Sequence, residues 1–278
     1  MKIELNFYTI CMFYQMKCNI INQMKQLHSF YFQDHLMLIT EKEPEKSHKH
    51  LASHLVLSLD CDMEWKVEGE TIKCRGIYID GNVEHVCFTK GHFVLFMFFK
   101  TSSWACSMEG SLLKGKPYAL LDEKLVEKIR NIVNSLTDIK NPPEPKALDE
   151  QILKICNFSK NHERKYDSRI QEAINTVENL QTITEVTIAQ LAEDAFLSQS
   201  RFSHLFKEQT GMSLASWFAF EKLRKTYRYL LTGMNITDSC MLAGFDSPSH
   251  CAATCTKMFG ISLGKIEGIS GLVPQNKK

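Results

Sequence analysis

The sequence predicts an α+β protein: an N-terminal β-barrel followed by helices, and an all-α C-terminal domain with two helix-turn-helix motifs. Short strand-like segments separated by turn residues occupy the region from Ser29 to about Phe99. After Gly115 the apolar residues recur at helical spacing. A pattern of short helix, turn, second helix and closing glycine then occurs twice, in residues 188–211 and 236–260. These patterns indicate two domains of different secondary structure.

Length and composition are those of an ordinary globular protein. At 278 residues the chain can form two domains, each with its own core. The hydrophobic fraction of 44% and the charged fraction of 23% are typical, and a net charge of +1 gives no electrostatic indication of nucleic-acid binding. The ten cysteines form neither a disulfide ladder nor a CxxC pair. We therefore expect the reducing environment of the cytoplasm.

Residues 1–23 predict an N-terminal extension. Their apolar run, Leu5–Tyr14, is too short to cross a bilayer, and no small-residue cleavage site follows it. A signal peptide is the less favoured alternative, and translation could start at Met16 or Met24. We expect no membrane contact.

Residues 24–118 predict the β domain. Its strand-like segments are rich in β-branched and aromatic residues, and glycine-containing turns at 68–70, 80–82 and 90–92 separate them. The clearest segments are Leu55–Leu59, Met63–Val67, Thr71–Cys74 and Phe93–Phe99. Evenly spaced short strands favour a small barrel or jelly roll.

Residues 119–160 predict two helices. The first, Asp122–Leu136, has an apolar stripe and begins with Asp122 as its cap. The Pro142–Pro145 run ends this pattern, and a second helix follows at about Ala147–Phe158. Because the stripe is wide enough for a partner helix, we expect this segment to mediate dimerisation. After it we expect, in order, a polar linker, the helical domain and a tail, at residues 161–167, 168–268 and 269–278.

In the first helix-turn-helix motif, polar side chains share one face of the second helix. Phe202, Leu205 and Phe206 lie three and four residues apart and should face the core, with Ser198 or Ser200 as the cap. The opposite face carries Gln199, Ser200, Arg201, Ser203, His204 and Lys207. Such side chains can reach base edges or phosphates from a helix in the major groove. The alternative is an ordinary solvated helix.

The second motif repeats this layout. Its turn, Asp246–Ser249, places Pro248 in the first turn of a helix with Ser247 as the cap. Between the motifs, residues 215–231 predict a linker helix with several basic residues, among them Arg224. Rigid coupling through this helix would hold the two second helices about one turn of DNA apart.

Several segments of the helical domain carry a resemblance to a known family. They are Ile188–Ala192, Leu197–Lys207, Thr210–Ser213, Leu230–Ile236 and Ala243–His250. With them, the stretch from about Ser168 to Leu263 resembles the DNA-binding domain of the AraC/XylS family of bacterial transcription regulators. The resemblance implies a regulator, usually an activator, that binds double-stranded promoter DNA and contacts RNA polymerase, with no enzymatic activity. It also implies an N-terminal cupin-like domain that senses a small molecule or dimerises.

The resemblance assigns DNA contacts to both motifs but favours the first. The expected DNA-binding residues are Gln199, Ser200, Arg201, Ser203, His204, Lys207, Arg224, Ser249, His250 and Lys257. In the second motif Ala253 stands where the family usually has Arg, while Cys251 and Cys255 replace core aromatic residues. We expect these thiols, like Cys240, to act as small hydrophobic residues, with a thiol sensor as the alternative. Base readout should therefore rest mainly on the first motif.

The helical domain is formally neutral, because basic and acidic residues are equally frequent from Asp167 to Lys278. Phosphate contacts supply much of the affinity of proteins for DNA. Tight binding then requires either clustered basic residues or a dimer that joins two sites. We expect a homodimer.

Histidines in the β domain suggest a metal site as an alternative. Metal-binding cupin barrels use an HxH pair and a later His, usually with a Glu. Here His48 and His50 form the pair, His85 is the later residue, and His54 stands where the Glu would be. The missing Glu and an extra residue after Gly81 argue against a metal, as does the fact that regulators with this barrel usually bind organic ligands. We expect no cofactor, with Zn²⁺ or Fe²⁺ as the alternative.

An effector pocket would lie inside the barrel. The candidate lining residues are Trp65, Tyr78, Phe88, Phe96 and Phe98. In the alternative, these aromatic side chains simply fill the interior.

The sequence thus predicts a cytoplasmic, dimeric, DNA-binding transcription regulator with a small-molecule effector. One alternative is a metal-dependent cupin enzyme with a degenerate helical appendage. Another is a degenerate regulator that acts through protein partners.

Overall fold

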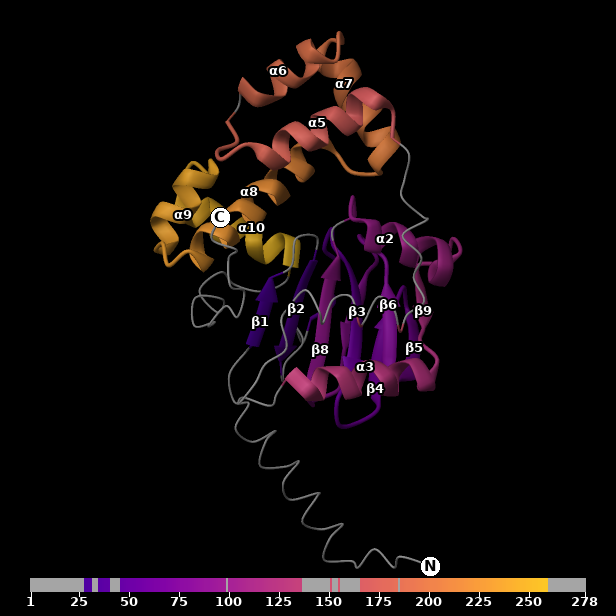
Figure 1. Ribbon diagram of the computed structural model, residues 1–278. Helices are drawn as coiled ribbons and strands as arrows, with labels where there is room; N and C mark the ends of the chain where they lie inside the picture. The colour runs from indigo at the N-terminus through magenta and orange to yellow at the C-terminus, as the bar shows by residue number, and fades with distance from the viewer. Residues whose placement is uncertain are drawn as a thin grey trace, which may run out of the picture.

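The computed structural model shows a sheet domain and a helical domain (Figure 1). The structure describes residues 28–31, 35–40, 46–98, 100–136, 151, 155, 166–184 and 186–259. The expected N-terminal extension, most of the second helix and linker, and the C-terminal tail lie outside these residues. Within the described part, no helix is both long and apolar enough to cross a membrane.

The sheet domain contains two antiparallel sheets, with strand orders β1-β2-β8-β3-β6-β9 and β5-β4-β7. The strands are β1 (His28–Tyr31), β2 (His35–Thr40), β3 (Ser53–Ser58), β4 (Met63–Val67), β5 (Glu70–Cys74), β6 (Gly76–Ile79), β7 (His85–Cys87), β8 (Phe93–Phe98) and β9 (Tyr118–Leu120). The described strands form two separate sheets that enclose an apolar interior. The prediction of a closed barrel is therefore corrected to a two-sheet sandwich.

The central strands β3, β6 and β8 of the larger sheet are buried on both faces, which explains their largely apolar sequences. Side chains alternate between the faces of a strand. In β8, Leu95 and Met97 face the smaller sheet, whereas Phe96 and Phe98 belong to a second cluster on the outer face.

Helices cover the outer face of the larger sheet (Figure 1). They are α2 (Ser103–Met108), the π-helix η1 (Glu109–Leu113) and α3 (Glu123–Leu136). Trp104 of α2 stacks on Phe98 at a centroid distance of 5.4 Å, and Val126 and Ile129 of α3 are buried against the same sheet. The apolar stripe of α3 therefore packs largely within its own chain. Dimerisation through this segment stays a prediction.

The helical domain has two small cores that share one long helix. Its helices are α5 (Ser168–Asn179), α6 (Val186–Asp194), α7 (Gln199–Thr210), α8 (Leu214–Leu231), α9 (Ile236–Ala243) and α10 (Pro248–Phe259). The start of α8 packs with α5, α6 and α7, and its later part packs with α9 and α10. The predicted linker helix thus joins the two helix-turn-helix units.

A glycine makes the turn between α9 and α10 possible. Gly244 has φ +98°, and a Cβ atom there would lie 2.0 Å from the carbonyl oxygen of Ile183. Only glycine accommodates both this backbone conformation and the close approach. The second helix-turn-helix unit is therefore fixed against the loop after α5.

The second unit also adjoins the sheet domain. Buried residues of the sandwich interior and of α8, α9 and α10 belong to one contiguous apolar cluster. Figure 1 shows α10 beyond the ends of β1 and β2. The first unit has a separate core and lies farther from the sheets (Figure 1).

Candidate nucleic-acid interface and histidine cluster

Helix α7, the second helix of the first unit, is capped at both ends. The Ser198 hydroxyl accepts a hydrogen bond from the backbone N–H of Arg201 at 3.3 Å, which satisfies one free donor of the first turn. At the other end Gly211 adopts φ +73° and its N–H donates to the Lys207 carbonyl. These caps fix the helix at the residues that the sequence predicted.

The buried and the exposed residues of α7 lie on the faces that the sequence predicted. Phe202, Leu205 and Phe206 are buried in the core of the first unit. The opposite face presents Gln199, Ser200, Arg201, His204 and Lys207 as exposed residues, with Ser203 half-buried. The structure thus brings the predicted DNA-binding residues of the first motif together on one accessible surface.

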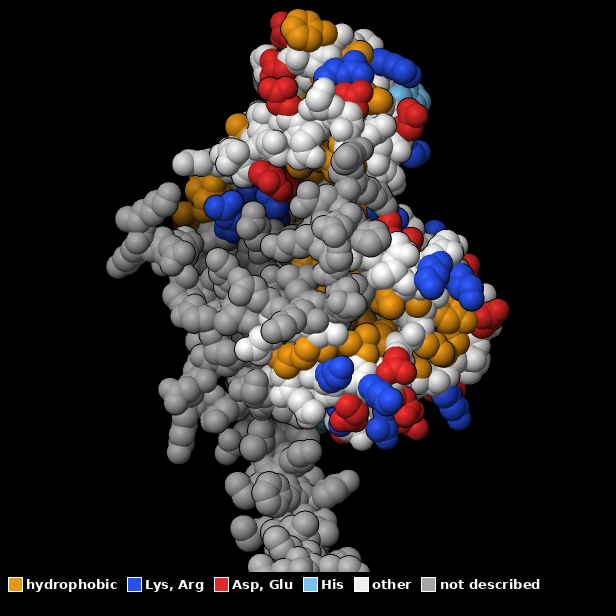
Figure 2. All heavy atoms as spheres, turned by 45° about the vertical axis from the view of Figure 1, so that its right-hand side comes forward, with side chains coloured by type: hydrophobic (Ala, Val, Ile, Leu, Met, Phe, Trp, Pro, Cys, Tyr) orange, Lys and Arg blue, Asp and Glu red, His pale blue; other side chains and the backbone are white. Residues whose placement is uncertain are grey.

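An exposed aromatic residue in the turn before α7 was not predicted. Phe196 has φ +54° and is 95% exposed. Figure 2 shows apolar surface at the tip of the helical domain, where α6 and α7 lie. The signal in the sequence was a large residue at the place where the second unit has Gly244.

Helix α10, the second helix of the second unit, has smaller side chains on its exposed face than α7 has. The Ser247 hydroxyl accepts from the backbone N–H of His250 at 3.1 Å and caps the helix. The His250 ring contacts the Asp246 carboxylate at 3.0 Å, so a carboxylate lies beside this expected DNA contact. The other exposed or half-buried residues of this face are Ser249, Ala252, Ala253, Thr256 and Lys257.

Arg224, an expected DNA contact, is buried within the helical domain. Arg224 is 8% exposed, and its guanidinium lies 3.3 Å from the Glu178 carboxylate and 3.1 Å from that of Glu221. Nearby, the Lys225 ammonium donates hydrogen bonds to the backbone carbonyls of Glu178 and Leu180. These basic side chains connect α8 to the end of α5.

Charges of both signs are interspersed on the visible surface of both domains (Figure 2). On α8, the Lys222 ammonium lies over the Phe245 ring, 5.8 Å from its centroid. The exposed basic residues of α7 and α10 are few: Arg201, Lys207 and Lys257.

The cysteines of the second unit lie in its core, as expected. Cys240, Cys251 and Cys255 are buried, and burial raises the pKa of each thiol, that of Cys255 to about 11. Protonated thiols are poor nucleophiles and metal ligands. The thiol-sensor alternative therefore receives no support from this geometry.

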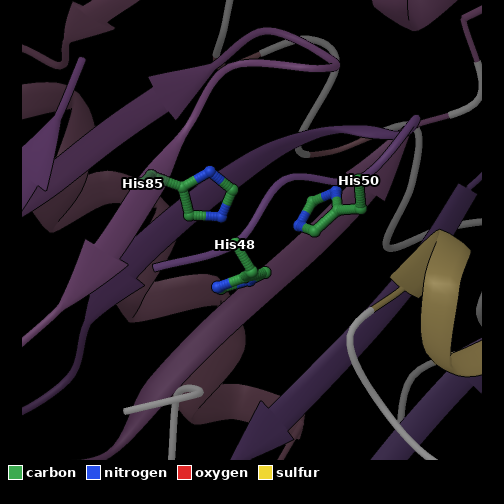
Figure 3. Close-up of side chains that lie close together, drawn as sticks. All are labelled: His48, His50 and His85. Carbon is green, nitrogen blue, oxygen red and sulfur yellow. The ribbon is translucent and has the colours of Figure 1, made fainter. Parts of the chain in front are cut away.

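Four histidines of the sheet domain, His48, His50, His54 and His85, lie together. His48 and His85 form an antiparallel backbone bridge, and His54 comes from β3 of the opposite sheet. Ring centroids are 4.4 Å apart for His48–His85 and 4.6 Å for His50–His54. One ring nitrogen from each of His48, His50 and His85 lies within 4.8 Å of the others, and Figure 3 shows these rings facing a common space.

Burial keeps the imidazoles of His50, His54 and His85 neutral. Desolvation lowers the pKa of His50 to about 3 and that of His85 to about 4, and it holds the pKa of His54 well below its usual value. The neighbouring histidines lower these pKa values further. The sequence suggested this grouping, and the structure brings all four residues together.

The aromatic residues expected to line a pocket do not share one space. Trp65 lies in the interior between the sheets. Tyr78 and Phe96 belong, like Phe98, to the cluster beneath α2 and α3, and Phe88 is 56% exposed. Among these candidates only Trp65 is placed to meet a ligand between the sheets.

Comparisons with known proteins agree with the geometry of the helical domain. A family described as "Helix-turn-helix domain" matches residues 191–267. The arabinose operon regulatory proteins of Salmonella typhimurium and Escherichia coli are each 31% identical over 97 residues, or 34% of this chain. That match spans about a third of the length of these relatives, 34% and 33%.

Solved structures extend the likeness to most of the fold. The apo form of a single-residue variant of ToxT from Vibrio cholerae superimposes with a TM-score of 0.55 at 10% identity, over 86% of this chain and 98% of that one. Wild-type ToxT of the same organism with an unsaturated fatty acid bound gives a TM-score of 0.50 at 11% identity, over 88% of this chain and 99% of that one. The two helix-turn-helix units on a shared helix are thus the part of the chain that matches these relatives. Over this domain the chain is similar to regulators of the AraC type.

Proposed function

We propose that the chain is a transcription regulator that reads promoter DNA mainly with α7. The observation that carries this proposal is the exposed face of α7, where Arg201, His204 and Lys207 lie opposite a buried core. A helix of this kind fits the major groove, where such side chains contact base edges and phosphates. The caps at Ser198 and Gly211 hold this face in place.

In this proposal α10 contributes backbone contacts rather than base readout. Its face carries small side chains at Ala252 and Ala253, which cannot hydrogen-bond to bases. His250 is paired with Asp246, whose charge repels phosphate. Lys257 in the last turn remains available for a phosphate.

Alanine substitutions test this division. Arg201→Ala and His204→Ala should each weaken specific binding roughly 5- to 100-fold, because one well-placed base contact is worth about 1–3 kcal/mol. His250→Ala should change binding less than about threefold, since no base contact is lost. The measurement is fluorescence anisotropy on DNA from upstream of the chain's own gene, after footprinting has located the site.

Arg75→Ala is the charge-matched control, because Arg75 is an exposed arginine of the sheet domain paired with Asp62. Its affinity for DNA should equal that of the unsubstituted protein. Equal losses for His204→Ala and His250→Ala would show that both units read bases. The absence of salt-sensitive protection in the footprint would contradict the proposal as a whole.

We also propose that the regulator is a cytoplasmic, non-enzymatic homodimer that activates transcription through RNA polymerase and responds to a small molecule. ToxT has been described with an unsaturated fatty acid bound, which supports a small-molecule role for this fold. A promoter–reporter fusion tests the sign of regulation, since deletion of an activator lowers the reporter output. Sedimentation of the full chain tests the dimer.

A further inference from the structure

Three rings of the histidine cluster, those of His48, His50 and His85, turn acceptor nitrogens toward a common space (Figure 3). The Nδ1 atoms of His48, His50 and His85 lie 3.0, 3.0 and 2.9 Å from the carbonyl oxygens of Lys46, Ala52 and Val83, respectively. A carbonyl oxygen can only accept, so each Nδ1 carries the hydrogen. In a neutral ring the Nε2 atom is then an acceptor.

His48, His50 and His85 therefore offer acceptors to a space that buried residues surround. Nε2 of His85 and both ring nitrogens of His54 are buried without a hydrogen-bond partner among the described residues. Unsatisfied buried polar atoms are costly, and their number at one place points to a missing group. A shared cation would satisfy Nε2 of His85 and the one acceptor nitrogen of His54 at once.

We propose that His48, His50 and His85 bind one divalent transition-metal ion of the zinc class, with His54 as a fourth ligand. Imidazole nitrogens select Zn²⁺, Ni²⁺, Cu²⁺ or Fe²⁺, whereas Mg²⁺ and Ca²⁺ require oxygen ligands. The ring nitrogens that lie within 4.8 Å of one another would close to roughly 3.3 Å around a tetrahedral zinc ion. This needs side-chain shifts of about an ångström.

The hydrogen bonds from Nδ1 support this assignment independently of the ring separations. Histidines that bind metals through one nitrogen usually donate the other N–H to a carbonyl or carboxylate, which fixes the tautomer and the ring orientation. Here three rings do so, each to a carbonyl two residues away in the chain. The ligands come from both sheets and from the segment before β3, so the ion would tie the sheets together.

Metal titration of the full chain tests the site without reference to DNA. Chelator-treated protein should bind one Zn²⁺ per chain in calorimetry, and Co²⁺ should give the visible absorption of a tetrahedral nitrogen site. A saturating amount of Zn²⁺ should raise Tm by about 5 °C, since a ligand of the native state stabilises it. Tight binding of less than about 0.2 equivalents of Zn²⁺, together with an unchanged Tm, would overturn the proposal.

Two variants locate the ion. His48→Ala removes a half-buried ligand at little structural risk, and His85→Gln removes a buried one. Each should weaken Zn²⁺ binding at least about tenfold and reduce the Co²⁺ absorption. His92→Gln, outside the cluster and paired with Asp60, should bind metal like the unsubstituted protein. Unchanged affinity in His48→Ala would place the metal elsewhere and overturn the assignment.

Discussion

At the scale of single residues, Phe196 combines an unfavourable backbone conformation with no burial to offset it. Its φ of +54° lies in the left-handed region, which costs an ordinary residue about 1–2 kcal/mol, and its ring is 95% exposed. Asparagine adopts this conformation more readily. We expect Phe196→Asn to increase the free energy of unfolding by about 1 kcal/mol, measured by urea denaturation.

Phe196→Ala separates backbone strain from loss of the exposed ring. Alanine keeps the strained Cβ, so this variant should stay within about 0.5 kcal/mol of the original protein. A gain in Phe196→Ala as large as in Phe196→Asn would attribute the effect to the ring instead. DNA binding by the two variants then shows whether the exposed ring serves the reading helix beside it.

At the scale of elements, a buried carboxylate couples the long helix α8 to its surroundings. Desolvation raises the pKa of Glu221 to about 7, and the nearby Arg224 charge only partly opposes this. The Glu221 side chain therefore binds a proton more tightly in the folded protein than in the unfolded chain. Its contribution to stability is complete below pH 4.5 and is lost as the pH rises through about 7.

Glu221→Gln removes this titration. Between pH 5 and pH 8 the variant should lose less stability than the original protein, by on the order of 2 kcal/mol. Denaturation curves at the two pH values measure this difference, and other titrating groups cancel in the comparison. Glu172→Gln, an exposed carboxylate of α5, serves as the control and should leave the pH dependence unchanged. If the stability of Glu221→Gln changed with pH as much as that of the original protein, the buried carboxylate would be ionised throughout this range.

The elements of the helical domain could be predicted from the sequence because their signals are local. The caps at Ser198 and Ser247 and the apolar spacing of α7 act over only a few residues. The environment of Arg224 is not local, since its partner Glu178 lies 46 residues away. An ion pair of this kind leaves no pattern in the sequence.

Prediction from the sequence was less successful for the sheet domain, for a different reason. Alternation of polar and apolar residues tells which face of a strand is buried, but β3 and β8 are apolar on both faces. Tyr78 and Phe96 were therefore assigned to the interior, although they face the helices. Helix α2 was missed because its six residues are too few for a clear helical period. The histidine grouping was suggested by spacing, whereas the orientation of its lone pairs depends on backbone carbonyls that only the structure places.

At the scale of the whole molecule, the affinity of a neutral helical domain for DNA should depend only weakly on salt concentration. Each phosphate contact contributes about −0.9 to the slope of log affinity against log salt concentration. Arg224 and Lys225 are buried in contacts to α5 and the loop after it, which leaves Arg201, Lys207 and Lys257 on the reading helices. We therefore expect a slope of roughly −3 per bound chain, and twice that for a dimer.

Lys257→Ala tests whether the second unit holds the DNA backbone. If α10 contributes a phosphate contact without reading bases, this variant should reduce the magnitude of the salt slope by about 1 per chain. It should also weaken binding to all DNA sequences alike. Titrations at several salt concentrations, on specific and unrelated DNA, measure both quantities. Lys73→Ala removes an equally charged side chain from the sheet domain, where Lys73 pairs with Glu64, and should leave the slope unchanged. A loss confined to the specific sequence would instead assign base readout to α10, and the two units would then share recognition.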